Sequence, residues 1–297
     1  TQKISCGTLS EPDSSRAPRG GNGHLFFKMI IHNFNPVLVD LGFFEIRWYS
    51  IAYILGIIIG WIYAGKIIKE TAKNKYKFES VKKSEFDDLL IYLVIGIILG
   101  GRLGYVIFYN FDYYSQNFTE IFKIWQGGLS FHGGLLGGIV TIYIFSKNKN
   151  TNFFKFSDIV ACVSPIGLFL GRIANFINGE LFGKISTLPW AIIFPNGGNI
   201  SRHPSQIYEA ILEGIVLFIL INFLALKKNL IIKTGYVSSF FLILYSIFRI
   251  FSENFREPDQ HLGYLFNYFS MGTLLSFLTL ITGFLIIFFI KKNEQNN

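Results

Sequence analysis

The stretch from Trp48 to Ile68 reads WYSIAYILGIIIGWIYAGKII, and Lys66 is its one charged residue. A helix needs about 20 consecutive, mostly apolar residues to cross the hydrocarbon core of a bilayer. This stretch has that length, and its apolar residues continue without the regular polar interruptions of an amphipathic helix. It therefore predicts a transmembrane helix.

Further apolar stretches of the same character follow along the chain. They are Leu89–Tyr109, Gly128–Phe145, Ile159–Phe176, Tyr208–Leu226, Tyr236–Phe255 and Tyr268–Ile290. The predicted fold class is an all-α integral membrane protein, a bundle of about seven transmembrane helices. No soluble domain fits between the stretches, so residues 29–297 are expected to form a single membrane-embedded domain.

The composition agrees with this class. The chain is 51% hydrophobic and only 15% charged, with a mean hydropathy of +0.42, whereas a soluble domain has about 25% charged residues. The net charge of +8 does not indicate a nucleic-acid partner, because nearly all the lysines lie in short gaps between apolar stretches. Cys6 and Cys162 are far apart and suggest neither a disulfide framework nor a metal site.

Residues 1–28 differ from the rest of the chain. They are polar, contain glycine, serine and proline, and have neither a long apolar stretch nor a small-residue cleavage site. Met29 opens the segment that resembles the remainder. We interpret residues 1–28 as a disordered or artificial extension without a function, and expect a natural start at Met29.

Alternate gaps between the apolar stretches collect the lysines. The first, third and fifth gaps and the C-terminal tail contain Lys66, Lys69, Lys73, Lys75, Lys77, Lys82, Lys83, Lys147, Lys149, Lys155, Lys227, Lys228, Lys233, Lys291 and Lys292. The other gaps contain Lys123, Lys184, Arg202 and Arg256. Short cytoplasmic loops are rich in Lys and Arg, so the N-terminus is predicted to be periplasmic and the C-terminus cytoplasmic.

Glycines recur at four-residue spacing within several stretches. Examples are Gly56/Gly60, Gly96/Gly100/Gly104, Gly133/Gly137 and Gly167/Gly171. Small residues at this spacing allow the backbones of membrane helices to approach closely. The pattern predicts a tightly packed bundle but says nothing of its chemistry.

Polar and ionisable groups within the stretches are costly in a membrane, so each is a candidate functional residue. With the predicted orientation they all collect at the outer side. They are Arg47, Tyr49, Arg102, His132, Arg172, Asn175, Tyr208, Glu209, Tyr245, Arg249 and Glu253. This segregation predicts one polar site that opens towards the extracytoplasmic leaflet.

The spacing of these groups favours a site for a phosphate. Tyr245, Arg249 and Glu253 are four apart and share one helix face. Arg172 is on another stretch, and two arginines with planar forks of donors suit phosphate oxygens. The alternative is purely structural: Arg249 pairs with Glu253, and Arg172 pairs with Glu180.

Five segments resemble one known family, the prolipoprotein diacylglyceryl transferases. They are GGRLGY (100–105), GGLSFHGG (127–134), GRIANFINGELFG (171–183), RHPSQIYE (202–209) and FRIFSENFREPD (248–259). They occur in the family's order, and the resemblance covers most of the chain from about Asn33 to Met271.

The resemblance implies a multi-pass enzyme of the bacterial inner membrane, with seven helices and an active site towards the periplasm. Its substrates would be phosphatidylglycerol and the signal peptides of prolipoproteins with a lipobox cysteine, and its surroundings membrane lipids. It would transfer the diacylglyceryl group to the cysteine thiol, form a thioether and release glycerol phosphate. Residues 29–297 would be the catalytic domain, and no cofactor, metal or nucleic acid is expected.

The resemblance also assigns roles to residues. Arg172 and Arg249 match essential arginines, and His132 matches the histidine of the HGG motif, so these three are the predicted catalytic residues. The predicted substrate-binding residues are Tyr49, Asn175, Glu180, Tyr245, Glu253, Gly127, Gly133, Gly183, Arg102 and His203.

Two questions stay open at this point. His132 is the first candidate for a general base that activates the thiol, because histidine is the side chain that most often takes this role, but it could instead only hydrogen-bond the headgroup or a helix backbone. Glu180 and Glu253 are expected to orient the arginines. Rival functions are a transporter or flippase for an anionic substrate, and another phospholipid headgroup transferase or a lipid phosphatase.

Overall fold

The computed structural model describes residues 30–42, 45–73, 81–258, 264–265 and 269–296. The predicted extension at residues 1–28, together with Met29 and Cys6, lies outside these ranges. The described chain is mostly helical, as the apolar stretches predict.

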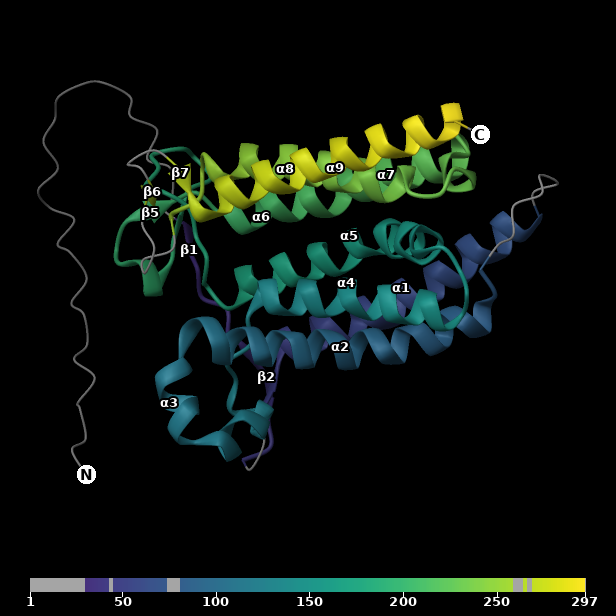
Figure 1. Ribbon diagram of the computed structural model, residues 1–297. Coiled ribbons are helices and arrows are strands. Elements are labelled where there is room, and N and C mark those ends of the chain that lie inside the picture. The colour runs from purple at the N-terminus through teal and green to yellow at the C-terminus, as the bar shows by residue number, and fades with distance from the viewer. Residues whose placement is uncertain (1–29, 43–44, 74–80, 259–263, 266–268, 297) are drawn as a thin grey trace, which may run out of the picture.

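The long helices run side by side (Figure 1). They are α1 (Trp48–Lys73), α2 (Lys83–Tyr109), α4 (Phe131–Asn148), α5 (Phe153–Ile177), α8 (Tyr236–Glu253) and α9 (Met271–Asn296). A further rod is made of α6 (Ser205–Glu209), the π-helical η4 (Ala210–Val216), α7 (Leu217–Asn222) and the π-helical η5 (Phe223–Lys227). Shorter helical elements are α3 (Phe111–Gln116), η1 (Phe118–Phe122), η2 (Ile124–Gln126), η3 (Pro195–Gly197) and η6 (Leu230–Ile232).

Six helices of the described residues are long and apolar enough to cross a membrane. They are α1, α2, α5 with Asn178, the rod from Ser205 to Lys227, α8 and α9. The stretch predicted at Gly128–Phe145 forms α4, which is not one of the six. Its glycines, His132 and the terminal Lys147 and Asn148 reduce its hydropathy. The class of multi-span helical protein therefore holds, and the count of seven remains a prediction.

The start of α5 differs from the predicted boundary at Ile159. The helix begins at Phe153, because the side chain of Asn152 accepts a hydrogen bond from the backbone N–H of Phe154 at 2.8 Å. An asparagine at this position satisfies a donor that the first helical turn leaves without a partner. Hydropathy alone does not register such a cap.

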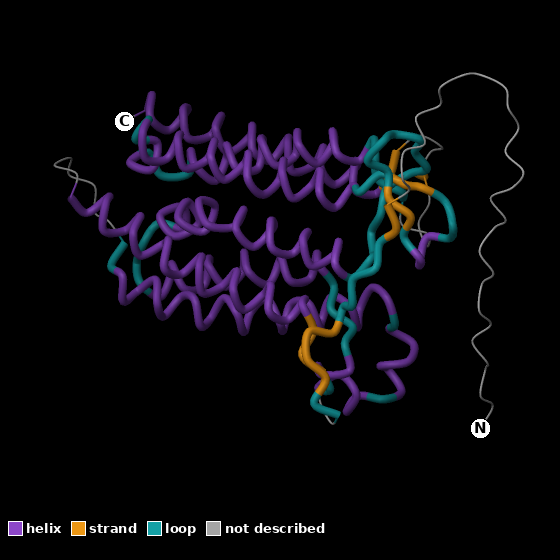
Figure 2. The backbone as a smooth tube through the Cα atoms, turned by 180° about the vertical axis from the view of Figure 1, so that it is seen from behind, coloured by secondary structure: helices purple, strands orange, loops and turns teal. Residues whose placement is uncertain are grey.

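Short strands were not predicted, and they join the helices near one end of the bundle (Figure 2). The strands β1 (Ile30–Ile31), β4 (Ile192–Ile193) and β5 (Ser201–Arg202) form a sheet in the order β1-β4-β5, parallel and then antiparallel. Two antiparallel pairs are β2 (Val37–Asp40) with β3 (Glu45–Arg47), and β6 (Tyr264–Leu265) with β7 (Phe269–Ser270). They shape the loops next to the predicted polar site.

Glycine packing brings α2 and α4 together, as the four-residue spacing predicts. A Cβ on Gly133 would collide with the carbonyl oxygen of Gly100 and lie 2.9 Å from the Cα of Gly104. A Cβ on Gly137 would lie 3.0 Å from the Cα of Gly100. The structure thus places Gly133, a predicted substrate-binding residue, in the contact between two helices.

The apolar core has two parts near the opposite end of the helices. One joins α1, α2, α4 and α5 around Leu89 and Phe156, and the other joins α1, α5, the rod and α8 around Leu217 and Val237. All four side chains are fully buried. Since α5 contributes to both parts, it connects the two halves of the bundle.

A buried carboxylate holds the start of α8. Asp158 of α5 accepts hydrogen bonds from the backbone N–H groups of Gly235 (2.7 Å) and Ser238 (2.8 Å) and from the Ser238 hydroxyl (2.6 Å). It therefore caps a helix to which it does not belong. Among the residues around it, Ser157 also contacts the Ser238 hydroxyl, at 2.8 Å.

We expect Asp158→Ala to lower the free energy of unfolding by about 1–2 kcal/mol, the usual effect of losing a helix cap. Asp158→Asn should lose less, because its remaining side-chain oxygen can still accept one backbone hydrogen bond. Thermal unfolding in detergent measures both, with the exposed Asp88→Ala as control. A loss with Asp158→Ala no larger than that of the control would contradict the capping role.

Candidate active site

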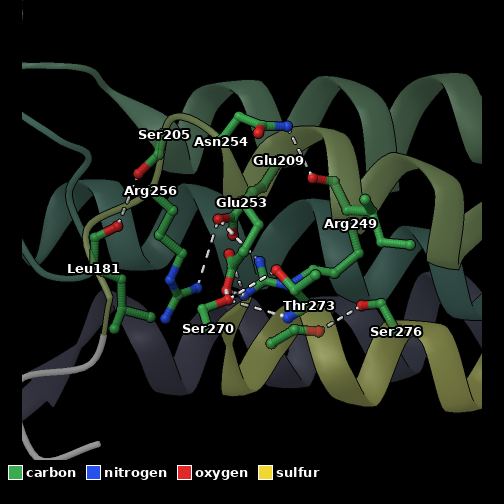
Figure 3. A network of polar contacts seen from close by, with 12 residues as sticks. Leu181, Ser205, Glu209, Arg249, Glu253, Asn254, Arg256, Ser270, Thr273 and Ser276 are labelled. Atoms are coloured by element: carbon green, nitrogen blue, oxygen red, sulfur yellow. Dashed lines mark hydrogen bonds and ion pairs between the residues drawn. The ribbon is translucent and has the colours of Figure 1, made fainter. Parts of the chain in front are cut away.

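Six charged side chains, most of them buried, form one network near the strand-bearing end of the bundle. Arg172 comes from α5, Glu209 and Glu213 from the rod, Arg249 and Glu253 from α8, and Arg256 from the segment that follows α8. Figure 3 shows Glu209 and Glu253 between Arg249 and Arg256. Three separate helices and a loop thus meet at one charged centre.

Glu209 is the shared partner of three arginines. Its carboxylate lies 2.8 Å from Arg172, 3.0 Å from Arg249 and 3.5 Å from Arg256. Glu213, one helical turn further along the rod, lies 3.1 Å from Arg172 and 3.5 Å from Arg249. Both carboxylates are almost completely buried, at 1% and 0% exposed. Among the described residues, arginines are the positively charged partners that balance them.

Glu253 completes the network at its more accessible side. It lies 3.2 Å from Arg249 and accepts a hydrogen bond of 3.0 Å from the Ser270 hydroxyl. A Cβ on Gly272 of α9 would collide with this carboxylate, so the glycine allows α9 to approach it. The predicted alternative that Arg249 pairs with Glu253 is confirmed.

The network is balanced in charge but not in hydrogen bonding. Three arginines face three glutamates, yet some buried atoms have ion-pair neighbours without any hydrogen bond. They are Arg249 Nη1, Glu209 Oε1, Glu213 Oε1 and Glu253 Oε2. Buried polar atoms normally have a hydrogen-bond partner. Arg249 Nη1 nevertheless lies 3.0 Å from Glu209 Oε1 and 3.5 Å from Glu213 Oε1, so these two carboxylates already enclose it.

A second polar group lies beside the network. Asn175, close to one turn after Arg172 on α5, donates to Glu180 at 2.8 Å and to the Tyr49 hydroxyl at 3.5 Å. Gln206 of the rod donates to the backbone oxygen of Glu180 at 2.6 Å. Tyr49, Asn175 and Glu180 are therefore brought together. Glu180 is bonded by Asn175 and not by an arginine as expected, and Arg172 pairs with Glu209 and Glu213 in place of Glu180.

Tyr245 and His132 occupy different settings. Tyr245 is one turn before Arg249 on α8 and stacks on Phe241, with ring centroids 6.0 Å apart. His132 is in the first turn of α4, just after the cap formed by Ser130, and its side chain is exposed. Its role as a base stays a prediction.

Backbone oxygens of the same chain accept the hydrogen bonds that Arg102 can donate. Its guanidinium donates to the backbone oxygens of Glu120 (2.7 Å), Ile121 (2.8 Å) and Gly127 (2.6 Å), and more weakly to those of Lys123 (3.4 Å) and Gly128 (3.2 Å). These contacts use every N–H of the group. The structure therefore places Arg102 and Gly127 in the support of the loop between α3 and α4.

We expect Arg102→Ala to open the segment 117–128, because up to five carbonyl groups lose a charged donor. Each such hydrogen bond contributes about 1.5–3 kcal/mol. Limited proteolysis should cleave this segment at least tenfold faster, and Arg102→Lys should give an intermediate rate, since an ammonium group donates at most three hydrogen bonds. Unchanged cleavage in Arg102→Ala would contradict the assignment.

Gly183 and His203 join the loops that cover the network. The Gly183 N–H donates to the backbone oxygen of His203 at 2.8 Å, and a Cβ on Gly183 would lie 2.6 Å from the His203 Cβ. His203 Nδ1 is 3.2 Å from the Tyr208 hydroxyl. Burial, and then the charge of Lys184, lower the pKa of His203. Both effects favour the neutral form of its ring.

Sequence reasoning missed two members of the network. Glu213 was not singled out, although a carboxylate in an apolar stretch, four residues after Glu209, carries the same signal as the Arg249 and Glu253 pair. Arg256 was taken as a loop charge because it follows the apolar stretch directly. After α8 the chain folds back towards the network, so that Arg256 lies 3.5 Å from Glu209. Only the fold shows this.

Comparisons with known proteins agree with this arrangement. A family model described as prolipoprotein diacylglyceryl transferase matches residues 36–289. The chain belongs to this family. The matched range contains every residue of the charged network.

Curated relatives are similar over nearly their whole length. A phosphatidylglycerol–prolipoprotein diacylglyceryl transferase of Rickettsia canadensis (strain McKiel) is 48% identical over 255 residues, 86% of this chain and 96% of the relative. Family members with the same name from Rickettsia africae (strain ESF-5) and Rickettsia bellii (strain OSU 85-389) are 47% and 46% identical. They cover 87% and 90% of this chain, and 98% of each relative.

Proposed function

We propose that this chain transfers the diacylglyceryl group of phosphatidylglycerol to the thiol of the lipobox cysteine in bacterial prolipoproteins. Family membership and the names of the curated relatives support this reaction. The observation in the structure that carries it is the pair of arginines, Arg172 and Arg249, which the shared buried carboxylate of Glu209 holds together.

The phosphodiester of the lipid would bind at Arg249 and Arg172. Glu253 is the most exposed of the three carboxylates, at 8%, so a phosphate oxygen can compete with it for Arg249. Glu209 and Glu213 are too deeply buried to be displaced and would hold both guanidinium groups in place. Arginine binds phosphate oxygens through two parallel hydrogen bonds, which orients the group as well as neutralising it.

The reaction breaks one carbon–oxygen bond and forms one carbon–sulfur bond. The cysteine sulfur attacks the glyceryl carbon that carries the phosphate, the C–O bond electrons pass to the phosphate oxygen, and the thiol proton goes to a base. The products are the thioether and glycerol phosphate. Negative charge grows on the leaving phosphate, and preorganised arginines stabilise such charge strongly in a site poor in water.

The other predicted residues support this chemistry. Tyr49, Asn175 and Glu180 form a hydrogen-bonded wall next to Arg172 and would contact the headgroup. Tyr245 would line the site one turn from Arg249, and His132 would accept the thiol proton from the start of α4. Gly183 would set the loop above the network.

We also propose that α4 is the seventh membrane span, beside α2, and that the enzyme lies in the bacterial inner membrane. The lysine-rich end would face the cytoplasm, with the N-terminus and the site on the periplasmic side. A secreted precursor presents its cysteine on that side. Cysteine labelling from outside intact cells, at Lys123 and at Lys228 exchanged for cysteine, distinguishes the two ends.

The activity is tested with a lipobox peptide and phosphatidylglycerol labelled in its glycerol backbone, in liposomes. Label on the peptide cysteine is expected. Free diacylglycerol alone would favour a lipid phosphatase, and movement of lipid between leaflets without covalent product would favour a flippase.

His132→Gln is expected to reduce transfer about 100-fold at neutral pH, the usual contribution of a positioned base. Raising the pH towards the thiol pKa should recover part of the rate, because the peptide then supplies thiolate itself. Full activity of His132→Gln at every pH would show that this residue is not the base.

A further inference from the structure

A groove lies at the lysine-rich end of the bundle, far along the helices from the charged network. It has a volume of about 690 Å³ and lies between the last turns of α1 and the start of α2. Apolar groups form most of its wall, including Trp61, Ile62, Ile68, Ala72 and Val81. A space of this size can hold a lipid headgroup and the first carbons of its chains.

Four lysines line this groove, two from each helix. Lys66 and Lys69 lie three residues apart on α1, and Lys82 and Lys83 stand at the N-terminal end of α2. The ammonium group of Lys83 lies 5.5 Å from the centre of the Trp61 ring. The positive end of the α2 dipole points to the same place.

The acidic residues described nearby have other partners. Asp87 accepts a hydrogen bond from Trp61 at 2.6 Å, and Asp88 pairs with Lys149 at 3.7 Å. Glu85 accepts from the Lys82 backbone at 3.3 Å, and Glu70 pairs with Lys73 at 3.8 Å. Among the described residues, the four groove lysines therefore have no carboxylate within ion-pair distance.

The surface beside the groove continues as an apolar strip. Ile54, Ile58 and Ile62 are each four residues apart on α1, so they share one face, and they are 53%, 43% and 51% exposed. Such a strip suits an acyl chain that runs along the helix. The position of Trp61, whose ring has an apolar body and a polar N–H, is typical of a membrane interface.

We propose that this groove binds an anionic phospholipid, with its phosphate among Lys66, Lys69, Lys82 and Lys83 and one acyl chain along Ile54, Ile58 and Ile62. The site is separate from the proposed catalytic centre and belongs to the opposite leaflet. Basic residues close to the bilayer surface attract anionic headgroups. Among the described residues, this groove combines four lysines that have no carboxylate within ion-pair distance with an adjoining apolar strip.

Trp61 allows a direct test. The chain has four tryptophans, and Trp48, Trp125 and Trp190 can be exchanged for phenylalanine, so that fluorescence reports Trp61 alone. The protein is placed in phosphatidylcholine vesicles with increasing amounts of phosphatidylglycerol brominated in its acyl chains, without acceptor peptide. We expect half-maximal quenching at a roughly tenfold lower mole fraction than with brominated phosphatidylcholine.

The lysines are then removed in matched sets of four. Exchange of Lys66, Lys69, Lys82 and Lys83 for glutamine should abolish the preference, and exchange of Lys227, Lys228, Lys291 and Lys292, at the same end, should preserve it. If the first set does not fold, the pair Lys66→Gln and Lys69→Gln should reduce the preference at least threefold. Equal quenching by both lipids, or equal losses in both sets, would overturn the proposal.

Discussion

Replacing Arg249 with alanine is expected to lower the rate of diacylglyceryl transfer about 100- to 1,000-fold. The leaving phosphate would lose its main source of positive charge, and losing one preorganised donor to developing charge has an effect of this size. Arg249→Lys should recover part of the rate, because it keeps the charge but lacks the planar fork. The peptide-labelling assay with phosphatidylglycerol measures both variants.

The same substitution also affects stability, so the two effects must be separated. Arg249→Ala leaves Glu209, Glu213 and Glu253 with less positive charge, and breaking a buried ion pair in this way costs roughly 3–5 kcal/mol. Thermal unfolding in detergent should therefore accompany the assay. Arg249→Lys should unfold close to the unmodified protein and still transfer slowly. Lys73→Ala, which removes an exposed lysine paired with Glu70 at 3.8 Å, is the control with full activity.

Near-normal turnover in both Arg249 variants would contradict the phosphate-binding role. A rate that follows the folded fraction in each variant, with no further loss, would make Arg249 a structural residue only.

Replacing Glu209 with glutamine is expected to have the largest effect on stability. Its carboxylate is the common partner of Arg172, Arg249 and Arg256, and it is 1% exposed. The exchange leaves three buried arginines with two carboxylates and should cost roughly 3–5 kcal/mol. The midpoint of thermal unfolding measures this loss.

A double variant tests whether the stability of the network depends on its balance of charge or on the shape of its side chains. Arg256→Met added to Glu209→Gln restores equal numbers of arginines and carboxylates in the network, so it should recover about half of the lost stability. Arg256→Met alone should destabilise, and the sum of the single losses should exceed that of the pair, as is usual for residues in contact. Additive losses would mean that the network is not electrostatically coupled.

Some of the predicted site residues lie together in the structure and others do not, and individual residues illustrate the reason. Arg249 and Glu253 lie four apart, so helical geometry alone places them together, and the structure has them 3.2 Å apart. Asn175 and Tyr49 meet because two adjacent helices carry them to the same depth. Arg102 has the same sequence signal as Arg172, a charged residue in an apolar stretch. Its role differs because backbone oxygens of a distant loop surround it.

Glu213 and Asp158 show the limit of such reasoning. Each is a carboxylate in an apolar stretch. The neighbouring residues in the sequence do not indicate that Glu213 pairs with two arginines or that Asp158 caps a helix. The partner of a buried charge is set by how helices dock, through contacts between residues that are far apart in the chain.

The sequence by itself determined that this chain is a helical membrane protein, because length and hydropathy are local properties that a bilayer selects directly. The spacing of Gly133 and Gly137 also predicted the close contact of α2 with α4. The same spacing at Gly167 and Gly171 gives no such contact, since a Cβ on either would meet no atom within 4 Å. Only the tertiary structure decided that Glu209 joins three arginines, that Arg102 supports a loop, and where strands shape the end of the bundle. The physical reason is that a charge buried in a bundle must find its partner across helices, and that choice depends on packing.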